Sequence, residues 1–309
     1  MSCGGLRPPT CEGLYKLRLI GMMPCRNEDW VLQTAIRVAM EWCDALVVLD
    51  HASTDDSPQI IDYLKASEFG DRLIWVSEED PAWAEMEHRQ HMLEVARRDG
   101  ATHLAIIDAD EVLSANVWEP VRAAADRMRP DHLMQLPGYN LRNGLDQYHA
   151  NGIWGQRWFS CVFMDDARLS WAGDRFHHRE PMGVALRPYR PIMQGHGGIL
   201  HLWGSEERRL RAKHALYKMT ETLRWPNKSH AEIDKLYTLA FDPSLNRQFD
   251  QDWRYAPVPD GWWAHREHLK STMPWQEWEC GQLYREHGAA RFAGLNLFGV
   301  CGHVMAEAG

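Results

Sequence analysis

The sequence lacks any uninterrupted apolar run of 18 or more residues, and its mean hydropathy is −0.48. A transmembrane helix needs roughly 20 mostly apolar residues, so we expect none. The first residues, MSCGGLRPPTCEG, also lack the long apolar stretch of a secretory signal peptide, and we interpret 1–14 as a flexible lead-in. These absences predict a cytoplasmic protein, either free or peripheral to a membrane.

Several sequence motifs are missing as well. The seven cysteines are widely scattered and include no CxxC pair, which disfavours a disulfide framework and a structural zinc site. No GxGxxG follows the first apolar run, and no GxxxxGK[ST] occurs, which disfavours dinucleotide-dependent redox chemistry and Walker-type nucleotide hydrolysis. The formal net charge of −9 argues against a surface that binds nucleic acid by neutralising its phosphates.

Short apolar runs alternate with helical patterns in the first half of the chain. The strands are expected at 17–24, 45–50, 72–77 and 103–108, and the helices at 28–42, from 53 onward and at 82–98. Near-continuous apolar strands that alternate with helices indicate a parallel sheet covered by helices. The predicted class is therefore α/β, with a Rossmann-like, mostly parallel sheet.

The pattern changes after about residue 131. DHLMQLPGY, RWFSCVFM and GILHLWG have the composition of strands, but no regular helix separates them. A charged helix is expected at 205–223, and the remainder is rich in Trp and Pro. We therefore expect an α/β half and an irregular, Trp-rich half with helices, sharing one cleft.

Polar residues follow all four predicted strands of the first half. Ligands of open parallel sheets bind outside the carboxyl ends of the strands, so these residues are expected to share one site. The fourth strand, HLAIID, leads directly into Asp108, Asp110 and Glu111. Clustered carboxylates are costly near a core unless a cation neutralises them, and a pair of this kind suits a hard divalent cation that also binds phosphate.

Four segments together resemble a family 2 glycosyltransferase of the GT-A fold. They are MMPCRNEDWVLQTAI, VVLDHASTDDSPQII, RQHMLEVARRDGATHLAIIDADEVL and ILHLWG, in the order and at the approximate spacing of that family. The resemblance covers about residues 17–205. It implies a GT-A domain at 15–204 that binds a nucleotide sugar, followed by a helical extension at 205–309 on the acceptor side.

The resemblance also implies a metal site. Asp108 and Asp110 match the family's DXD motif, which holds the Mn²⁺ or Mg²⁺ bound to the diphosphate of the sugar nucleotide. Asp110 would be the direct ligand, while Asp108 would face the ribose or a metal-bound water. His201, in the HLW motif, would complete the site, and Trp203 would pack or stack beneath it.

The nucleotide pocket follows from the same resemblance. Asp50 lies where family members contact the base, usually uracil, although His51 replaces the usual second acid. Arg89 matches a basic residue on the helix before the DXD strand. Residues of the first strand end complete the implied pocket: Pro24, Arg26, Asn27 and Glu28.

Family 2 enzymes characteristically invert the anomeric centre, which requires a general base near the acceptor hydroxyl. Related enzymes often show a G-x-[IV]-H-E pattern where this chain has WAGDRFHHREP, and His178 stands at the position of that Glu. The candidate bases, in order, are Glu180, Asp174 and His178, because carboxylates are the usual bases in this chemistry.

The predicted function is metal-dependent transfer of a hexose-like sugar from a nucleoside-diphosphate sugar, with a UDP-sugar favoured as donor. The acceptor stays open among a glycan, a lipid-linked glycan, a protein and a small molecule, with a modified DNA base disfavoured by the net acidity. The alternatives are a non-catalytic carbohydrate-binding protein, since Trp faces stack on sugar rings, and a DxD phosphatase or phosphotransferase.

Overall fold

The computed structural model describes residues 16–155, 157–175, 177–242 and 252–301. The lead-in predicted at 1–14 lies outside these residues. A nine-stranded sheet forms the centre of the molecule, in the order β3-β2-β1-β4-β8-β6-β10-β5, with β9 paired to β6. Its strands are β1 Leu19–Cys25, β2 Ala45–His51, β3 Leu73–Glu78, β4 His103–Ile106, β5 Glu111–Leu113, β6 His132–Asn140, β8 Arg157–Met164, β9 Arg187–Tyr189 and β10 Ile199–His201.

Most of the strand pairs are parallel. The antiparallel pairs involve β8, which joins β4 to β6, and β5, which pairs with β10. The strands expected in the first half are found within two residues of their predicted bounds. The prediction of an α/β class with a mostly parallel sheet flanked by helices is thus confirmed.

Helices cover both faces of the sheet. Alternate residues of β1 enter two different cores: Leu19 and Met23 pack with α1 and α4, whereas Ile20 and Met22 pack with α3. Both faces are therefore shielded from water, which explains why these strands are apolar throughout. The covering helices are α1 Leu32–Trp42, α2 Ser57–Leu64, α3 Glu85–Arg98 and α4 Trp118–Ala125.

The first helix begins later than the sequence pattern suggests. The expected helix 28–42 starts at Leu32, because residues 28–31 form a turn in which the Glu28 carbonyl accepts hydrogen bonds from the amides of Val31 and Leu32. The turn leaves Glu28 at the end of the sheet rather than inside a helix. That position matters for the site described below.

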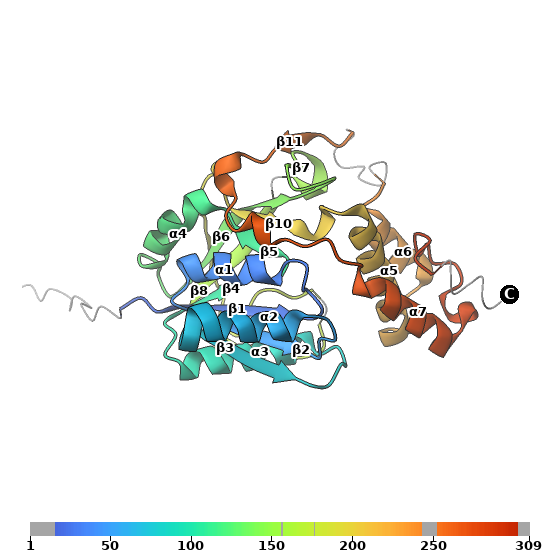
Figure 1. Ribbon diagram of the computed structural model, residues 1–309, viewed down its shortest axis with the longest axis horizontal. Coiled ribbons are helices and arrows are strands. Elements are labelled where there is room, and N and C mark those ends of the chain that lie inside the picture. Colours follow the sequence, from blue (N-terminus) through green and yellow to red (C-terminus); the bar gives the residue numbers. More distant parts are fainter. Residues whose placement is uncertain (1–15, 156, 176, 243–251, 302–309) are drawn as a thin grey trace, which may run out of the picture.

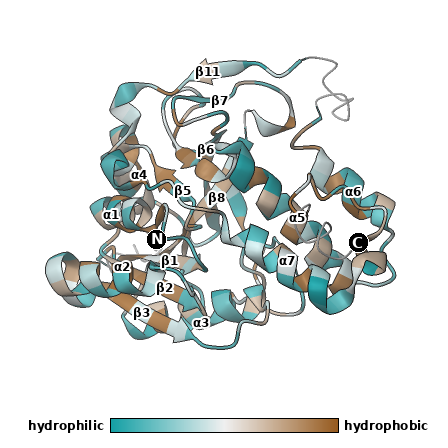
Figure 2. Cartoon of the chain, turned by 45° about the vertical axis from the view of Figure 1, so that its right-hand side comes forward, coloured by the Kyte–Doolittle hydropathy of each residue, from teal (hydrophilic) through white to brown (hydrophobic). Residues whose placement is uncertain are grey.

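A helical group lies at one end of the molecule (Figure 1). It consists of α5 Glu207–Arg224, α6 His230–Thr238 and α7 Trp275–His287, and its own small core includes Met219, Cys280 and Phe292. In Figure 2 this group again stands to one side of the sheet. The helical, Trp-rich C-terminal region predicted from the sequence is present, and the boundary at 204/205 stays a prediction.

One part of the C-terminal region packs away from these helices. Residues 252–272 run along the sheet half, where β11 Tyr255–Pro257 pairs with β7 Gln147–His149 and Trp262 packs against Tyr139. The Lys270 amide then donates to the Trp30 carbonyl at 2.8 Å before the chain enters α7. The segment therefore connects the sheet half with the helical group.

Among the described residues, no helix combines the length and apolar composition needed to cross a bilayer.

Candidate functional site

A cleft of about 460 Å³ lies between the carboxyl ends of the strands and the helical group. Its walls come from the first and fourth strand ends, from β10 and from the inward faces of α5 and α7. Charged and aromatic side chains dominate its lining, including Arg26, Glu28, Arg89, Asp108, Asp110, His201, Lys213, Tyr217, Trp203 and Trp275. The two halves of the chain thus share this cleft.

Strand pairing brings Asp110 and His201 together. β10 lies between β5 and β6, with His201 opposite Glu111 on one side and Asn140 on the other. The Leu202 amide donates to the Asp110 carbonyl at 2.8 Å, and His201 Nε2 lies 3.6 Å from Asp110 Oδ1. The backbone of the sheet therefore fixes the distance between these side chains.

A close backbone approach sets the start of β10. Gly198 has φ +152°, and a Cβ at this position would lie 2.1 Å from the Pro137 carbonyl oxygen. The residue is also clamped to Ser114, which exchanges two hydrogen bonds with it. Only glycine fits here, because any side chain would push β10 away from β6.

The amide of Asn140 determines the tautomer of His201. Asn140 Nδ2 donates to the Trp154 carbonyl, so its Oδ1 accepts, and it does so from Trp203 Nε1 at 2.9 Å. His201 Nδ1, 3.0 Å from the same Oδ1, must then donate. In the neutral imidazole the lone pair is consequently on Nε2, which faces Asp110.

Asp108 is held by two arginines. Arg89 donates to Oδ1 at 3.2 Å, and Arg179 donates to Oδ2 at 2.8 Å. Burial alone would raise the pKa of Asp108, but Arg179 and Arg89 lower it below its ordinary value. Arg89 is on the buried face of α3, together with Met86 and Leu93.

Arg179 also neutralises Glu111. It donates to both carboxylate oxygens, at 2.7 and 2.6 Å, and to the Ile106 carbonyl at 2.8 Å. Burial raises the pKa of Glu111, and Arg179 opposes this rise. Glu111 does not line the cleft, so its role is to anchor Arg179 beneath Asp108.

Lys213 is the cation next to Asp110. It extends from α5, and its Nζ donates to Asp110 Oδ2 at 2.6 Å. Burial opposes the low pKa of Asp110, yet Lys213 holds it well below the ordinary value. Burial likewise opposes the high pKa of Lys213, which Asp110 raises. Asp110 is therefore a carboxylate at neutral pH.

Glu28 is an acid of a different kind. It lines the cleft, and its Oε2 accepts from Trp30 Nε1 at 2.6 Å. Burial raises the pKa of Glu28 to about 7, with Lys213 opposing the rise and Asp110 adding to it. Its carboxyl group thus exchanges its proton near neutral pH.

Two residues of the predicted nucleotide pocket hold loops instead of lining the cleft. Asn27 Oδ1 accepts from the amides of Thr54 and Asp55 and so ties the first strand end to the second. Asp50 accepts from the Ser53 amide at 3.3 Å, and burial raises its pKa. The lining does include Pro24, Arg26 and Glu28 from the first strand end and the neighbouring His51.

The three candidate bases lie outside the residues that line the cleft. Glu180 is exposed and accepts from the Ser160 hydroxyl at 2.5 Å, and Asp174 forms an ion pair with Arg224. His178 is half-buried. From the same segment, His177 does line the cleft, with Nε2 3.3 Å from the Tyr237 hydroxyl.

Sequence reasoning missed Lys213 and Arg179. Lys213 has a detectable signal, since it precedes Tyr217 by one helical turn on the charged helix that was expected at 205–223. Arg179 stands between two candidate bases, but nothing local connects it with the DAD motif. Both gain their roles from the way distant segments pack.

The tryptophans after the acidic motif divide into several environments. Trp275 lines the cleft and carries the Arg26 guanidinium 5.2 Å above its ring. Trp262 is buried in the core of the sheet half, and the Trp278 side chain is 61% exposed. Trp203 stacks between His201 and His214, the packing role expected for it.

The donor atoms fit a divalent cation at one point. Asp110 Oδ1 and His201 Nε2 face each other 3.6 Å apart, and when the imidazole is neutral both are acceptors that a cation can bridge. Carboxylate and imidazole together suit Mn²⁺ and related ions. Both Asp108 oxygens are instead engaged by guanidinium groups, so Asp110 and His201 would hold the ion directly.

No protein-family model and no curated protein sequence matches the chain. Among solved structures, TarS 1–349 of S. aureus is similar with a TM-score of 0.44 and 12% identity, covering 74% of this chain and 73% of that one. Glucosyl-3-phosphoglycerate synthase from Mycobacterium tuberculosis, in complex with Mn²⁺, UDP and phosphoglyceric acid, has a TM-score of 0.32 and 16% identity, with 40% and 44% covered. The chain thus spans less than half of that synthase.

Proposed function

We propose that this chain is a metal-dependent glycosyltransferase. It would move a hexose-like unit from a nucleoside-diphosphate sugar, most favourably a UDP-sugar, to an acceptor hydroxyl with inversion. The observation that carries the proposal is the pair Asp110 Oδ1 and His201 Nε2, fixed by strand pairing and by Asn140 at 3.6 Å within a large cleft. The proposed cofactor is Mn²⁺ or Mg²⁺.

The charges that line the cleft suit a diphosphate. Arg26, Arg89 and Lys213 all line it, and the bound dication would supply Lewis-acid stabilisation of the leaving diphosphate. Lys213 is already charged and desolvated beside Asp110, so it can bind a phosphate oxygen with little reorganisation. Arg89 holds Asp108 toward the same region, which supports its proposed contact with the ribose or a metal-bound water.

The acceptor hydroxyl would attack the anomeric carbon as the bond to the diphosphate breaks, and its proton would pass to a general base. Glu180, Asp174 and His178 remain the proposed bases from the sequence. His177 joins them because it lines the cleft, and burial lowers the pKa of its imidazole, which favours the neutral form. Comparing Glu180→Gln, Asp174→Asn, His178→Gln and His177→Gln distinguishes these assignments, because only the base variant loses turnover of bound donor.

The direct test compares Asp110→Ala and His201→Ala with the unmodified protein in sugar-nucleotide turnover with Mn²⁺. Both variants should lose at least about 100-fold in turnover, because each removes a proposed ligand of the catalytic ion. Glu119→Gln, an exposed acid on α4, is the matched control and should leave turnover unchanged. Undiminished turnover in both cleft variants would contradict the metal-site assignment.

Two other functions remain to be compared by experiment. Asp108 accepts from two arginines through both oxygens, which favours a transferase over a phosphotransferase that needs a free aspartate nucleophile. Hydrolysis of a generic phosphate ester without any sugar nucleotide would reverse this preference. Glycan binding that is indifferent to metal, with no donor turnover, would favour a carbohydrate-binding protein.

The donor and acceptor are further parts of the proposal. A thermal-shift screen of UDP, GDP, CDP and dTDP sugars with Mn²⁺ identifies the base, and a UDP-sugar should give the largest shift. The acceptor classes are a glycan, a lipid-linked glycan, a protein or a small molecule, with a modified DNA base less favoured. The cytoplasmic location expected from the sequence stays a prediction.

A further inference from the structure

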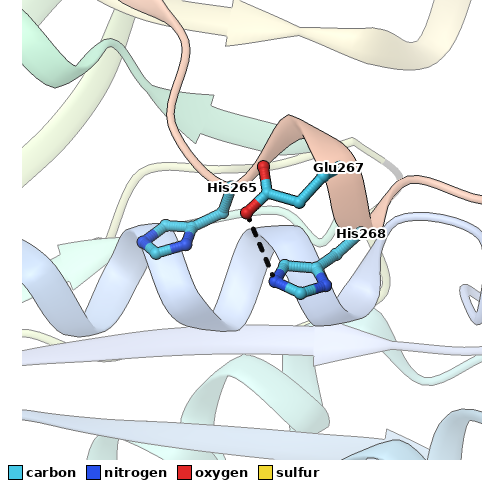
Figure 3. A group of neighbouring side chains, drawn as sticks. All are labelled: His265, Glu267 and His268. Carbon is cyan, nitrogen blue, oxygen red and sulfur yellow. Dashed lines mark ion pairs between the residues drawn. The ribbon is translucent and has the colours of Figure 1, made fainter.

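A second group of potential metal ligands lies outside the cleft. His265, Glu267 and His268 each place one ligand atom within 4.8 Å of the others, and within the described part of the chain they form the one such group of three. Figure 3 shows both imidazoles beside a helix, with the Glu267 carboxylate between them. None of the three lines the cleft.

The turn that carries these residues is fastened to α1. The Thr34 hydroxyl donates to the His265 carbonyl at 3.0 Å, and the His268 amide donates to the same carbonyl at 3.2 Å. One turn further along the chain, the Lys270 amide donates to the Trp30 carbonyl. The ligands therefore project from a backbone that is already positioned, which lowers the cost of ordering them around an ion.

A carboxylate from α1 orients His265. Glu41 Oε1 lies 3.1 Å from His265 Nε2, so a residue far away in the sequence contacts the turn. Metal-binding histidines usually donate their second ring nitrogen to a carboxylate, which fixes the tautomer and increases the basicity of the other nitrogen. Glu41 thus contacts His265 as a carboxylate contacts the second ring nitrogen of a metal-bound histidine.

The Glu267 carboxylate is also available to a bound cation. The neighbouring Arg266 pairs with Asp146 at 2.7 Å, while the ion-pair partner described for Glu267 is His268, at 3.5 Å. No Arg or Lys therefore competes, in the contacts described, with a dication for this carboxylate. Both imidazoles are about 30% exposed (28% for His265, 29% for His268), so an ion and its water ligands can reach them from solvent.

We propose that His265, Glu267 and His268 bind a transition-metal dication of the Zn²⁺ class, with Glu41 as the group that positions His265. Two imidazoles and one carboxylate are a donor set that Zn²⁺ accepts, with the fourth position left to water. The site is separate from the proposed transferase function.

The test is calorimetric titration of the full chain with ZnCl₂. His201 and Asp110 can also bind Zn²⁺, so the titration is repeated with the D110N/H201Q variant. This variant should still bind one equivalent of Zn²⁺. Adding H268Q to the D110N/H201Q protein should weaken its affinity for Zn²⁺ at least tenfold. Adding H265N as well should abolish this zinc binding. Asn suits position 265, where φ is +57°, because it tolerates the left-handed conformation.

A matched control comes from α7, where His287 and Glu286 are adjacent, with His287 Nε2 3.8 Å from the carboxylate. H287Q in the same background should leave zinc binding unchanged. Circular-dichroism melting curves without metal should superimpose for the D110N/H201Q protein and for the turn and control variants made in it, which shows that the turn still folds. Absence of a zinc equivalent in the D110N/H201Q protein, or its retention after H265N/H268Q, would overturn the proposal.

Discussion

The cleft and the exposed turn both combine histidine with carboxylate, but they balance charge differently. In the cleft Asp108 and Asp110, and beneath it Glu111, each accept hydrogen bonds from a basic side chain of the protein. On the turn, Glu267 meets only His268 in the described contacts. Buried carboxylates need built-in counter-charges to fold, whereas exposed ones rely on water.

This difference predicts two kinds of metal binding. A dication in the cleft must share Asp110 with Lys213, so it should bind tightly only when a diphosphate is present to draw Lys213 away. On the turn no lysine competes in the described contacts, so the metal should bind alone. Substitutions that change the charge balance of one site at a time test this difference.

The largest effect is expected from Arg179→Met. The change leaves Glu111, whose side chain is 5% exposed, as an unpaired buried carboxylate. Loss of one partner of a buried pair costs about 4 kcal/mol of unfolding free energy, measured by urea denaturation. Arg168→Met breaks an exposed pair with Asp166 and should leave the unfolding midpoint unchanged. Equal midpoints for the two variants would contradict the proposed anchoring role.

Gly198→Ala should have the next largest effect. The added methyl group would clash with the Pro137 carbonyl, so β10 must shift, at a cost of about 3 kcal/mol in unfolding free energy. Mn²⁺ binding should weaken as His201 moves from Asp110. At Gly195, φ is +84° but no atom would lie within 4 Å of an added Cβ, so Gly195→Ala should cost only about 1 kcal/mol. A Gly198 variant no less stable than the Gly195 variant would exclude the steric argument.

Lys213→Met separates metal binding from turnover. Removing the ammonium should strengthen the binding of Mn²⁺ alone by about tenfold in calorimetry, because Asp110 loses a competing cation. Sugar-nucleotide turnover should nevertheless fall about 30-fold, which corresponds to about 2 kcal/mol. Arg211→Met removes an exposed cation from the same helix, α5, and is the control for both measurements. Weaker binding of Mn²⁺ alone in the Lys213 variant would refute the competition.

The smallest effect is expected for Glu28→Gln. The pKa of Glu28 in the folded state, about 7, lies above the usual value near 4.3. Between about pH 4.3 and pH 7 the folded state therefore binds the Glu28 proton more tightly than the unfolded state does. The contribution of Glu28 to stability is therefore complete at low pH and is lost as the pH rises through 7. Gln should remove about 1 kcal/mol of this pH dependence, seen in urea unfolding between pH 6 and 7. The His265 turn offers the control, because Glu267→Gln should leave that profile unchanged.

Local sequence predicted the parallel half of the sheet well. β1, β2 and β3 lie within two residues of their expected bounds, because strands covered on both faces must be apolar at every position. The start of α1 was less accurate, since the turn at 28–31 continues the apolar pattern of the helix that follows. Periodicity cannot separate a turn from a helix when both bury the same face.

The candidate site was only partly predictable. Asp108, Asp110 and His201 were recognised through motifs, and the structure places all three in the lining of one cleft. The contact of Lys213 with Asp110 depends on how α5 docks, and the contact of Arg179 with the Ile106 carbonyl depends on a loop that reaches beneath β4. Short-range sequence patterns contain no information about either contact.

Residue types and their spacing were enough to predict which strands are buried on both faces and where the carboxylates cluster, because burial and charge depend on those two properties. What those carboxylates contact depends on how the chain packs. His201 reaches Asp110 only through the pairing of β10 with β5, and Glu41 reaches His265 only because the turn lies on α1. Such contacts join residues far apart in the chain, and only the packed fold sets their separation.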